Sequence, residues 1–250
     1  RSLIRQGDMF QCVLSQRFSA EYSGRPLDYY RNLRVTNPSN YLYFYDFGDY
    51  QIIGASPESL VSVKQGQVTT NPIAGTRPRG QDEREDKSLA EELLADEKEV
   101  AEHRMLVDLG RNDIGKIAQN NSVEVTKYME VEYFRYVMHL TSVVRGQLLP
   151  QLTAMDALKS TLPAGTVSGA PKIRAMKRIY ELEQEKRGVY AGAIGYLSAT
   201  GDMDFAIAIR TMILKNGRAY VQAGAGIVYD SIPANEYQET INKAKSMTKI

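Results

Sequence analysis

Residues 86–117, DKSLAEELLADEKEVAEHRMLVDLGRNDIGKI, separate two groups of predicted strands and decide the fold class. The leucines and valines of this segment recur at helical spacing among charged, helix-favouring residues, so it predicts one or two long helices. Strands are predicted at 10–18, 41–45, 51–53 and 60–63, within 123–144, and at 190–197, 204–214 and 219–223. Further helices are predicted at 153–161, 171–183 and 234–247. Strands in groups favour an α+β fold of large, mostly antiparallel sheets in layers with helices on their outer faces, over a doubly wound α/β fold.

Composition is that of an ordinary globular protein, with 250 residues, 43% hydrophobic and 24% charged, and we expect one catalytic domain over 1–250. A formal net charge of +1 argues against a nucleic-acid partner. No stretch has the length of apolar sequence needed to cross a bilayer, and one cysteine, Cys12, suits a reducing compartment, so we expect a cytoplasmic protein without a membrane partner. The chain lacks an initiator Met and opens within a predicted helix, which indicates a fragment of a longer protein.

Two Glu-x-x-Glu pairs are the first candidate site. Glu99 and Glu102 lie three residues apart in a predicted helix and so share one face, and Glu236 and Glu239 repeat the arrangement in the last helix. A solvated helix face is the ordinary explanation for either pair. If the fold brings the pairs together, their oxygens suit Mg²⁺, which prefers carboxylates and water.

Other metals have few ligands in this sequence, because His103 and His139 are the only histidines and Cys12 the only thiol. His103 follows Glu102 directly, points to another side of the helix, and is best explained as a core or capping residue. His139 alternates with apolar neighbours in a predicted strand, where an acid–base role is one option.

Glycine-rich segments at 71–80, 163–172 and 223–226 match neither a P-loop nor a dinucleotide fingerprint, so nucleotide binding is disfavoured. Their turns either shape the chain or present N–H groups to carboxylates. In the strand predicted at 204–214, Arg210 shares a face with Ala206 and Ala208, so it binds either a ligand carboxylate or an internal acid.

Several short segments, taken together and in this order, resemble the chorismate-utilising enzymes over nearly the whole chain. They are SPE at 56–58, PIAGTRPR at 72–79, DEKEVAEH at 96–103, LGRND at 109–113, GTVSGAPK at 165–172 and AGAGI at 223–227. Within the family, the likeness is greatest to the large subunits that make anthranilate. Those subunits are about twice as long as this sequence. The half that has no counterpart here normally includes much of the site at which tryptophan inhibits them.

The resemblance implies a lyase that converts chorismate and ammonia to anthranilate and pyruvate, the first committed step of tryptophan biosynthesis. It implies that Mg²⁺ bridges the two glutamate pairs and the ring carboxylate of chorismate. Glu58 matches the general acid for the departing C4 hydroxyl, which requires a carboxyl shielded from water. His139 matches the residue that transfers a proton during pyruvate loss. The other matching positions hold the substrate or form the pocket wall: Ala74, Gly75, Thr76, Thr166, Tyr190, Arg210, Ala223, Gly224, Gly226 and Lys243.

Two positions distinguish between members of this family. Gln11 stands where isochorismate and salicylate synthases carry a lysine that activates water, so ammonia is the expected nucleophile. Ala74 stands where aminodeoxychorismate synthases carry a lysine linked to covalent capture of the ring, which favours direct attack of ammonia. The alternatives are an aminodeoxychorismate synthase, an aminodeoxyisochorismate synthase, and a non-catalytic module that binds chorismate or an amino acid.

Ammonia requires a source, and Cys12 lies within a predicted strand instead of on the tight elbow that a glutaminase nucleophile needs. We therefore expect a separate glutamine amidotransferase subunit as partner, with free ammonium as a substitute.

Overall fold

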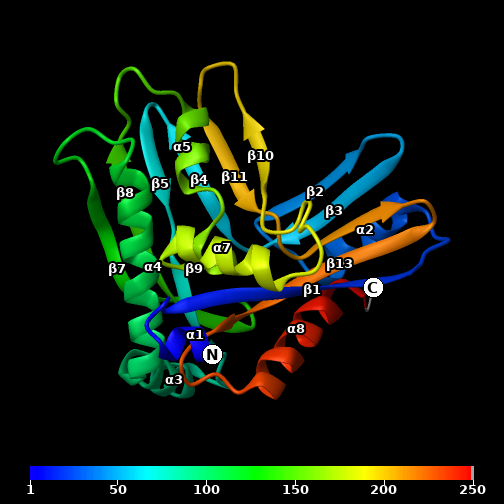
Figure 1. Ribbon diagram of the computed structural model, residues 1–250, viewed down its shortest axis with the longest axis horizontal. Coiled ribbons are helices and arrows are strands. Elements are labelled where there is room, and N and C mark those ends of the chain that lie inside the picture. Colours follow the sequence, from blue (N-terminus) through cyan, green and yellow to red (C-terminus); the bar gives the residue numbers. More distant parts are fainter. Residues whose placement is uncertain (249–250) are drawn as a thin grey trace. The chain divides into compact units, whose positions relative to one another are not determined.

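The computed structural model describes residues 1–248 (Figure 1). The described chain divides into two compact units, one made of 1–58, 163–194 and 206–250 and the other of 59–162 and 195–205. Each unit is therefore assembled from separate stretches of sequence. The assignment of 1–250 to a single catalytic domain stays a prediction.

The first unit is built on a six-stranded sheet in the order β2-β3-β12-β13-β1-β9. These strands are β1 (Gln11–Glu21), β2 (Tyr41–Asp46), β3 (Tyr50–Ser56), β9 (Gly169–Ala170), β12 (Thr211–Lys215) and β13 (Arg218–Ile227). Neighbouring strands pair antiparallel, and β1 and β13 lie together over their whole length with Cys12 opposite Ile227 and Glu21 opposite Arg218. The sheet thus aligns the Gly-rich end of β13 with the start of β1.

Helices cover this sheet, and apolar residues hold them in place. The helices of the unit are α1 (Ser2–Arg5), α2 (Pro26–Thr36), α6 (Gly165–Ser168), α7 (Lys172–Leu182) and α8 (Pro233–Thr248). Leu33 of α2 and Met247 of α8 are fully buried in one core cluster with Ile53, Met212 and Val221 of the sheet. Figure 1 shows α8 lying along β13, where it positions Glu236 and Glu239.

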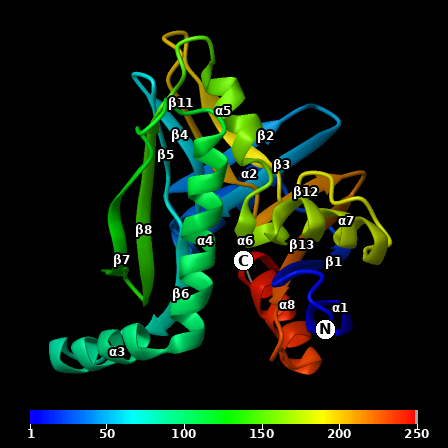
Figure 2. The same cartoon turned by 60° about the vertical axis from the view of Figure 1, so that its left-hand side comes forward.

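The second unit contains most of a seven-stranded sheet in the order β10-β11-β4-β5-β8-β6, with β7 also paired to β8. Its strands are β4 (Ser59–Lys64), β5 (Gln67–Thr70), β6 (Ile73–Pro78), β7 (Glu124–Tyr133), β8 (Val137–Gln147), β10 (Ala193–Leu197) and β11 (Met203–Ile207). Its helices are α3 (Glu83–Ala95), α4 (Glu97–Gly115) and α5 (Ala154–Thr161). Figure 2 shows α4 running along the sheet at β8, and Leu93 of α3 packs with Met138 and Leu140 of β8.

The α+β class with antiparallel sheets is confirmed, and segment 86–117 forms the two helices α3 and α4. The single strand predicted over 204–214 is wrong, because the chain leaves one sheet at Ile207 and joins the other at Thr211. Arg210 lies in this break with φ +50°, a left-handed conformation that ends strand geometry. The strand predicted from residue 190 begins only at Ala193, after a turn in which Ala191 also has positive φ.

None of the described helices combines the length and the apolar sequence that a membrane-spanning helix requires.

Candidate active-site residues

Glu58 lies at the end of the first unit's first stretch, just after β3. Its backbone carbonyl accepts a 3.0 Å hydrogen bond from the Ile207 N–H, and the fully buried Ser56 hydroxyl donates to the Ile207 carbonyl at 2.7 Å. The Ser-Pro-Glu turn is therefore anchored to β11 through backbone atoms. This anchoring leaves the Glu58 carboxyl available for chemistry.

The Glu58 carboxyl is half-buried, and removal from water raises its pKa from 4.5 to about 7. The Thr166 hydroxyl, Lys243 and Arg210 act in the opposite direction. The Thr166 oxygen is covered and has no hydrogen bond of regular geometry among residues 1–248, yet it lies near enough to Glu58 to favour the ionised form. A carboxyl with this pKa is substantially protonated near neutral pH, as a general acid requires.

Tyr190 and Arg210 lie beside Glu58 in the same unit. Burial raises the pKa of Tyr190 to about 12 and lowers that of Arg210, and each of these two groups responds to the charge of Glu58. A phenol and a guanidinium with a high ordinary pKa stay a hydrogen-bond donor and a cation at neutral pH. The pair is suited to bind a carboxylate.

Gly224 and Lys243 complete this group of residues. A Cβ at Gly224 would lie 2.6 Å from the Tyr190 hydroxyl and 2.9 Å from the Leu14 carbonyl, so only glycine fits. Lys243 Nζ donates to the Gly224 carbonyl at 3.1 Å and pairs with Glu239 at 2.5 Å. Helix α8 and strand β13 therefore present a glycine, an ammonium and a carboxylate together.

Gln11 and Gly226 form a smaller contact at the same end of β13, two residues beyond Gly224. Gln11 is 4% exposed in β1, and a Cβ at Gly226 would meet its amide nitrogen at 2.7 Å. Ala223 is also buried and lies opposite Gln16 in the β1–β13 ladder. The position at which related synthases carry a lysine is thus a neutral, buried amide.

His139 lies in β8 of the second unit, opposite Thr76 of β6. Its Nδ1 is 2.9 Å from the Gly75 carbonyl and 3.1 Å from the Thr76 hydroxyl. Because a carbonyl only accepts, Nδ1 is the donor in this contact, and Nε2 is the ring nitrogen left for another partner. Ala74, also predicted, is buried in β6 opposite Leu140.

A β-bulge at Gly75 brings this segment to the glutamate helix. The β6–β8 register shifts between Ala74 and Thr76, and Gly75 has φ +70°. A Cβ on Gly75 would lie 3.3 Å from Glu99 Oε2 and 3.0 Å from Leu93. The structure thus brings Gly75, Thr76, His139 and Glu99 together in the second unit.

Glu99 and Glu102 are half-buried one turn apart near the start of α4. Desolvation raises the pKa of Glu99, with further contributions from Glu102 and Asp96, while Arg77 lowers it. In the first unit, Glu236 is half-buried and Glu239 is exposed, and both lie on α8. Within residues 1–248 no three His, Cys, Asp or Glu side chains are gathered into a metal centre.

The donor set fits a hard cation. Glu99 and Glu102 supply oxygen atoms, and Glu102 raises the pKa of Glu99, so a bound cation would relieve their mutual repulsion. The α8 pair also supplies oxygens, one of which pairs with Lys243 at 2.5 Å. All of these donors are carboxylate oxygens, the ligand type that hard divalent cations such as Mg²⁺, Ca²⁺ and Mn²⁺ prefer.

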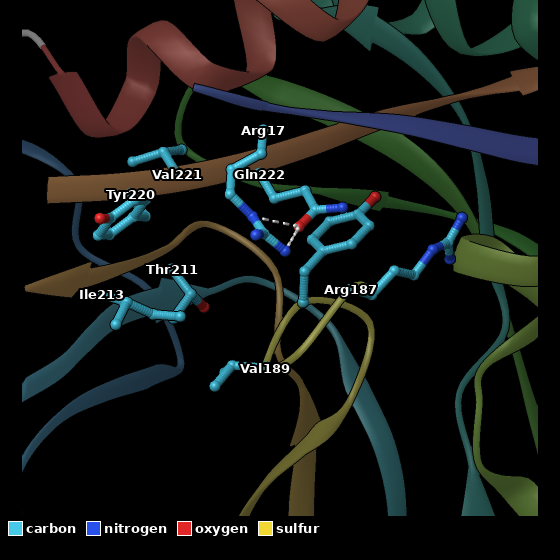
Figure 3. Close-up of a pocket in the computed structure, with 9 residues that line it drawn as sticks. Arg17, Arg187, Val189, Thr211, Ile213, Tyr220, Val221 and Gln222 are labelled. Carbon is cyan, nitrogen blue, oxygen red and sulfur yellow. Dashed lines mark hydrogen bonds between the residues drawn. The ribbon is translucent and has the colours of Figure 1, made fainter. Parts of the chain in front are cut away.

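Figure 3 shows a small pocket in the first unit, with Arg17 and Gln222 joined by two 3.3 Å hydrogen bonds. It is large enough for one or two water molecules. Tyr190 also lines it, but Arg17 is engaged by Glu185 and by the Lys186 carbonyl. The pocket therefore adjoins the Glu58 group without adding a free cation to it.

His103 and Cys12 are core residues, and for His103 this is one of the two explanations that the sequence favoured. His103 is fully buried, its Nε2 lies 2.6 Å from the Ser142 hydroxyl, and burial lowers its pKa to about 4. Cys12 is 5% exposed in β1, and burial raises its pKa to about 11. A neutral buried thiol is a poor nucleophile.

Sequence reasoning missed Arg77 and Arg187. Arg77 lies 3.9 Å from Glu99, and the Arg187 guanidinium lies over the Tyr190 ring at 5.4 Å. The signal for Arg77 was its place directly after Gly75-Thr76. No local pattern indicated Arg187, because the stacking depends on the turn at 188–192.

Comparisons with known proteins agree over the whole chain. A family model described as chorismate binding enzyme matches residues 1–249. Anthranilate synthase component 1 of Lactococcus lactis subsp. lactis is 64% identical over 250 residues, which cover 100% of this chain and 55% of that protein. The chain spans about half the length of the curated relatives it matches.

Two solved structures are similar to this chain over almost its whole length. The crystal structure of anthranilate synthase component I from Streptococcus pneumoniae has a TM-score of 0.93 and 83% identity, covering 99% of this chain and 55% of that one. The menaquinone-specific isochorismate synthase of Escherichia coli has a TM-score of 0.89 and 27% identity, with 99% and 57% covered.

Proposed function

This chain belongs to the chorismate binding enzymes, and from that premise we propose that it converts chorismate and ammonia to anthranilate, pyruvate and water. The reaction makes it a lyase of tryptophan biosynthesis. The relatives named anthranilate synthase component 1, at 64% and 57% identity, support this choice within the family.

One observation carries the proposal: a carboxyl whose pKa is about 7, Glu58, lies among Tyr190, Arg210 and Lys243. Chorismate carries two carboxylates and a hydroxyl that must leave. A proton donor surrounded by cations and a phenol meets both requirements.

Substrate binding is assigned to the groups around Glu58. Arg210 and Lys243 attract the carboxylates, and the Tyr190 hydroxyl donates a hydrogen bond to one of them. Gly224 leaves space beside the Tyr190 hydroxyl, where any larger side chain would intrude. The half-buried site strengthens these interactions relative to open water.

In the first half of the reaction, ammonia adds at C2 while the C4 hydroxyl leaves. Glu58 donates its proton to that hydroxyl, which departs as water, and Thr166 positions the resulting carboxylate. In the second half, the proton at C2 is removed, the C3–O bond to the enolpyruvyl group breaks and the ring becomes aromatic, while the departing enolpyruvate takes up a proton at its methylene carbon to become pyruvate. His139 transfers a proton in this half through Nε2, because Nδ1 is held by the Gly75 carbonyl.

Mg²⁺ is proposed as the cofactor, held by Glu99, Glu102, Glu236 and Glu239. An ion held there would supply positive charge for the ring carboxylate of chorismate. The raised pKa of Glu99 beside Glu102 supports a cation at this helix face.

Gln11 and Ala74 select the product in this proposal. A buried neutral amide at Gln11 cannot activate water, so ammonia is the nucleophile. Ala74 has no amine to capture the ring covalently. The family alternatives are an aminodeoxychorismate or aminodeoxyisochorismate synthase, and Ala74→Lys should shift the product distribution toward a non-aromatic amino compound, as chromatography would detect.

Ammonia is proposed to come from glutamine through a partner amidotransferase subunit. The partner is needed because Cys12 is buried and its thiol protonated. A cytoplasmic location, where chorismate and glutamine occur together, is part of the same proposal.

The test is an assay with chorismate and ammonium, with and without Mg²⁺, followed by anthranilate fluorescence and pyruvate release. Equal amounts of the two products, formed only with Mg²⁺, are expected. A non-aromatic amino product would refute the assignment within the family, and chorismate binding without turnover would instead indicate a binding module.

A further inference from the structure

Arg77 links strand β6 to the first turn of the helix that carries Glu99. Its Nε donates to Glu92 at 2.9 Å, its Nη2 donates to Asp96 at 2.9 Å, and its Nη1 donates to the Thr76 carbonyl at 3.1 Å. The Arg77 side chain is 19% exposed and that of Asp96 31%, so the Arg77–Asp96 bond is the one partly shielded from water, whereas Glu92 is exposed. Each donor group of Arg77 thus has a defined protein partner.

Asp96 is the N-cap of α4, and its two carboxylate oxygens have separate partners. Oδ1 accepts from the backbone N–H groups of Lys98 and Glu99, at 3.1 and 3.2 Å, while Oδ2 accepts from Arg77. An N-cap that is itself held in place fixes the backbone of the first turn. Arg77 therefore acts on the backbone of Glu99 through Asp96.

The guanidinium also lies 3.9 Å from the Glu99 carboxylate, beyond hydrogen-bond distance. This proximity allows two opposite effects on a metal ion at Glu99. If charge dominated, Arg77 would compete with the ion and its removal would tighten binding. If orientation dominated, its removal would weaken binding, because outer partners of a metal ligand fix that ligand's position.

We propose that Arg77 is a positioning residue that holds Glu99, through Asp96, in the orientation that binds Mg²⁺. The inference rests on the proposed metal role of Glu99. Orientation is favoured because the three donor groups of Arg77 bond to Glu92, Asp96 and Thr76, and none bonds to Glu99.

Arg79 supplies a matched control two residues along the same segment. It forks onto Asp86 of α3 with Nε at 3.0 Å from both oxygens, and its Nη1 donates to the Phe134 carbonyl at 2.7 Å. It also ties β6 to the helical layer, but its hydrogen bonds and its ion pair within residues 1–248 go to Asp86 and Phe134 and not to Asp96 or Glu99. Arg79→Gln therefore removes a comparable clamp without changing the α4 cap.

The experiment titrates the whole chain with Mn²⁺, as a paramagnetic substitute for Mg²⁺, and follows free Mn²⁺ by electron paramagnetic resonance. Arg77→Gln should weaken binding about tenfold or more, the usual effect of losing an outer-shell partner. Arg77→Lys should also weaken it, because an ammonium cannot reproduce the fork to Glu92 and Asp96. Arg79→Gln should bind like the parent chain.

Unchanged or tighter Mn²⁺ binding by Arg77→Gln would overturn the positioning role. Glu99→Gln separates this failure from failure of the proposed function: if it binds Mn²⁺ like the parent, Glu99 is not a ligand and both proposals fall. If Arg77→Gln does not fold, Asp96→Asn provides the test, since it keeps an oxygen for the cap and removes the charge that Arg77 contacts. Weaker binding by Asp96→Asn is expected, and parent-like binding would refute the link.

Discussion

Glu58 combines a backbone-anchored turn with a carboxyl whose pKa burial raises from 4.5 to about 7. A general acid must be protonated to act, so turnover should decline as the pH rises through about 7. We expect the rate constant of anthranilate formation to fall about tenfold per pH unit above that point, at constant free ammonia. A flat profile between pH 6 and 9 would be inconsistent with this role.

Glu58→Gln should reduce turnover by roughly 10²- to 10⁴-fold while chorismate still binds, because the amide cannot supply the proton. The same variant should alter stability in a pH-dependent way. A raised pKa in the folded state favours folding at low pH, and this contribution is lost as the pH rises from 4.5 through about 7. Urea unfolding should therefore show Glu58→Gln gaining stability relative to the parent at pH 8 but not at pH 4.

His139 is held by the Gly75 carbonyl through Nδ1, which leaves Nε2 for proton transfer. His139→Met should impair pyruvate release more than amination, so the aminated, non-aromatic intermediate should accumulate. Chromatography of quenched reactions would detect it. If amination and pyruvate release slowed equally, His139 would have a different role.

For single residues, the sequence predicted which side chains share a helix face better than it predicted contacts between distant segments. That Glu99 and Glu102 share a face of α4 followed from their three-residue spacing, which is a local property of the sequence. The Gly75–His139 and Arg77–Asp96 contacts join residues that are distant in sequence, and they depend on the β6–β8 register and on the bulge at Gly75. No sequence pattern fixes such a register in advance.

Among the elements, α2 shows how core packing holds a helix that the sequence analysis did not predict. Its Leu33 is fully buried in the cluster beneath the six-stranded sheet, while Val35 on the same helix is 81% exposed. Leu33→Ala should lower the free energy of unfolding by about 2–5 kcal/mol through cavity formation. Val35→Ala should change it by less than about 0.5 kcal/mol. Urea denaturation compares the two, and similar losses would show that α2 is not held by Leu33.

Element boundaries show where local reasoning fails. Alternation of side chains suggested one strand over 204–214, but β11 and β12 belong to different sheets, and Arg210 with φ +50° makes the change of sheet possible. The apolar residues on both sides of the break are strand-like, so composition gives no sign of it. In contrast, the helical spacing of apolar residues among charged ones predicted α3 and α4 directly.

For the whole molecule, ammonia supply is the property that can be tested most simply. The purified chain should form anthranilate from chorismate with ammonium and Mg²⁺ but not with glutamine, since Cys12 is buried with a pKa of about 11. Cys12→Ser should leave ammonium-dependent activity close to that of the parent. Glutamine-dependent product that disappeared in Cys12→Ser would show that this chain has its own glutaminase.

The interleaved composition of the two units has a consequence for inheritance. Because 1–58, 163–194 and 206–250 form one unit while 59–162 and 195–205 form the other, a single cut in the coding sequence cannot release either unit intact. Recombination with a related gene at any one of these junctions would give the first unit parts from two parents, and a crossover at 162/163 or 194/195 would also mix the second unit. Leu33 of the first stretch, which packs with Met212 and Met247 of the last, must then suit partners from the other parent. Such genes are expected to diverge by point substitution more readily than by exchange of segments.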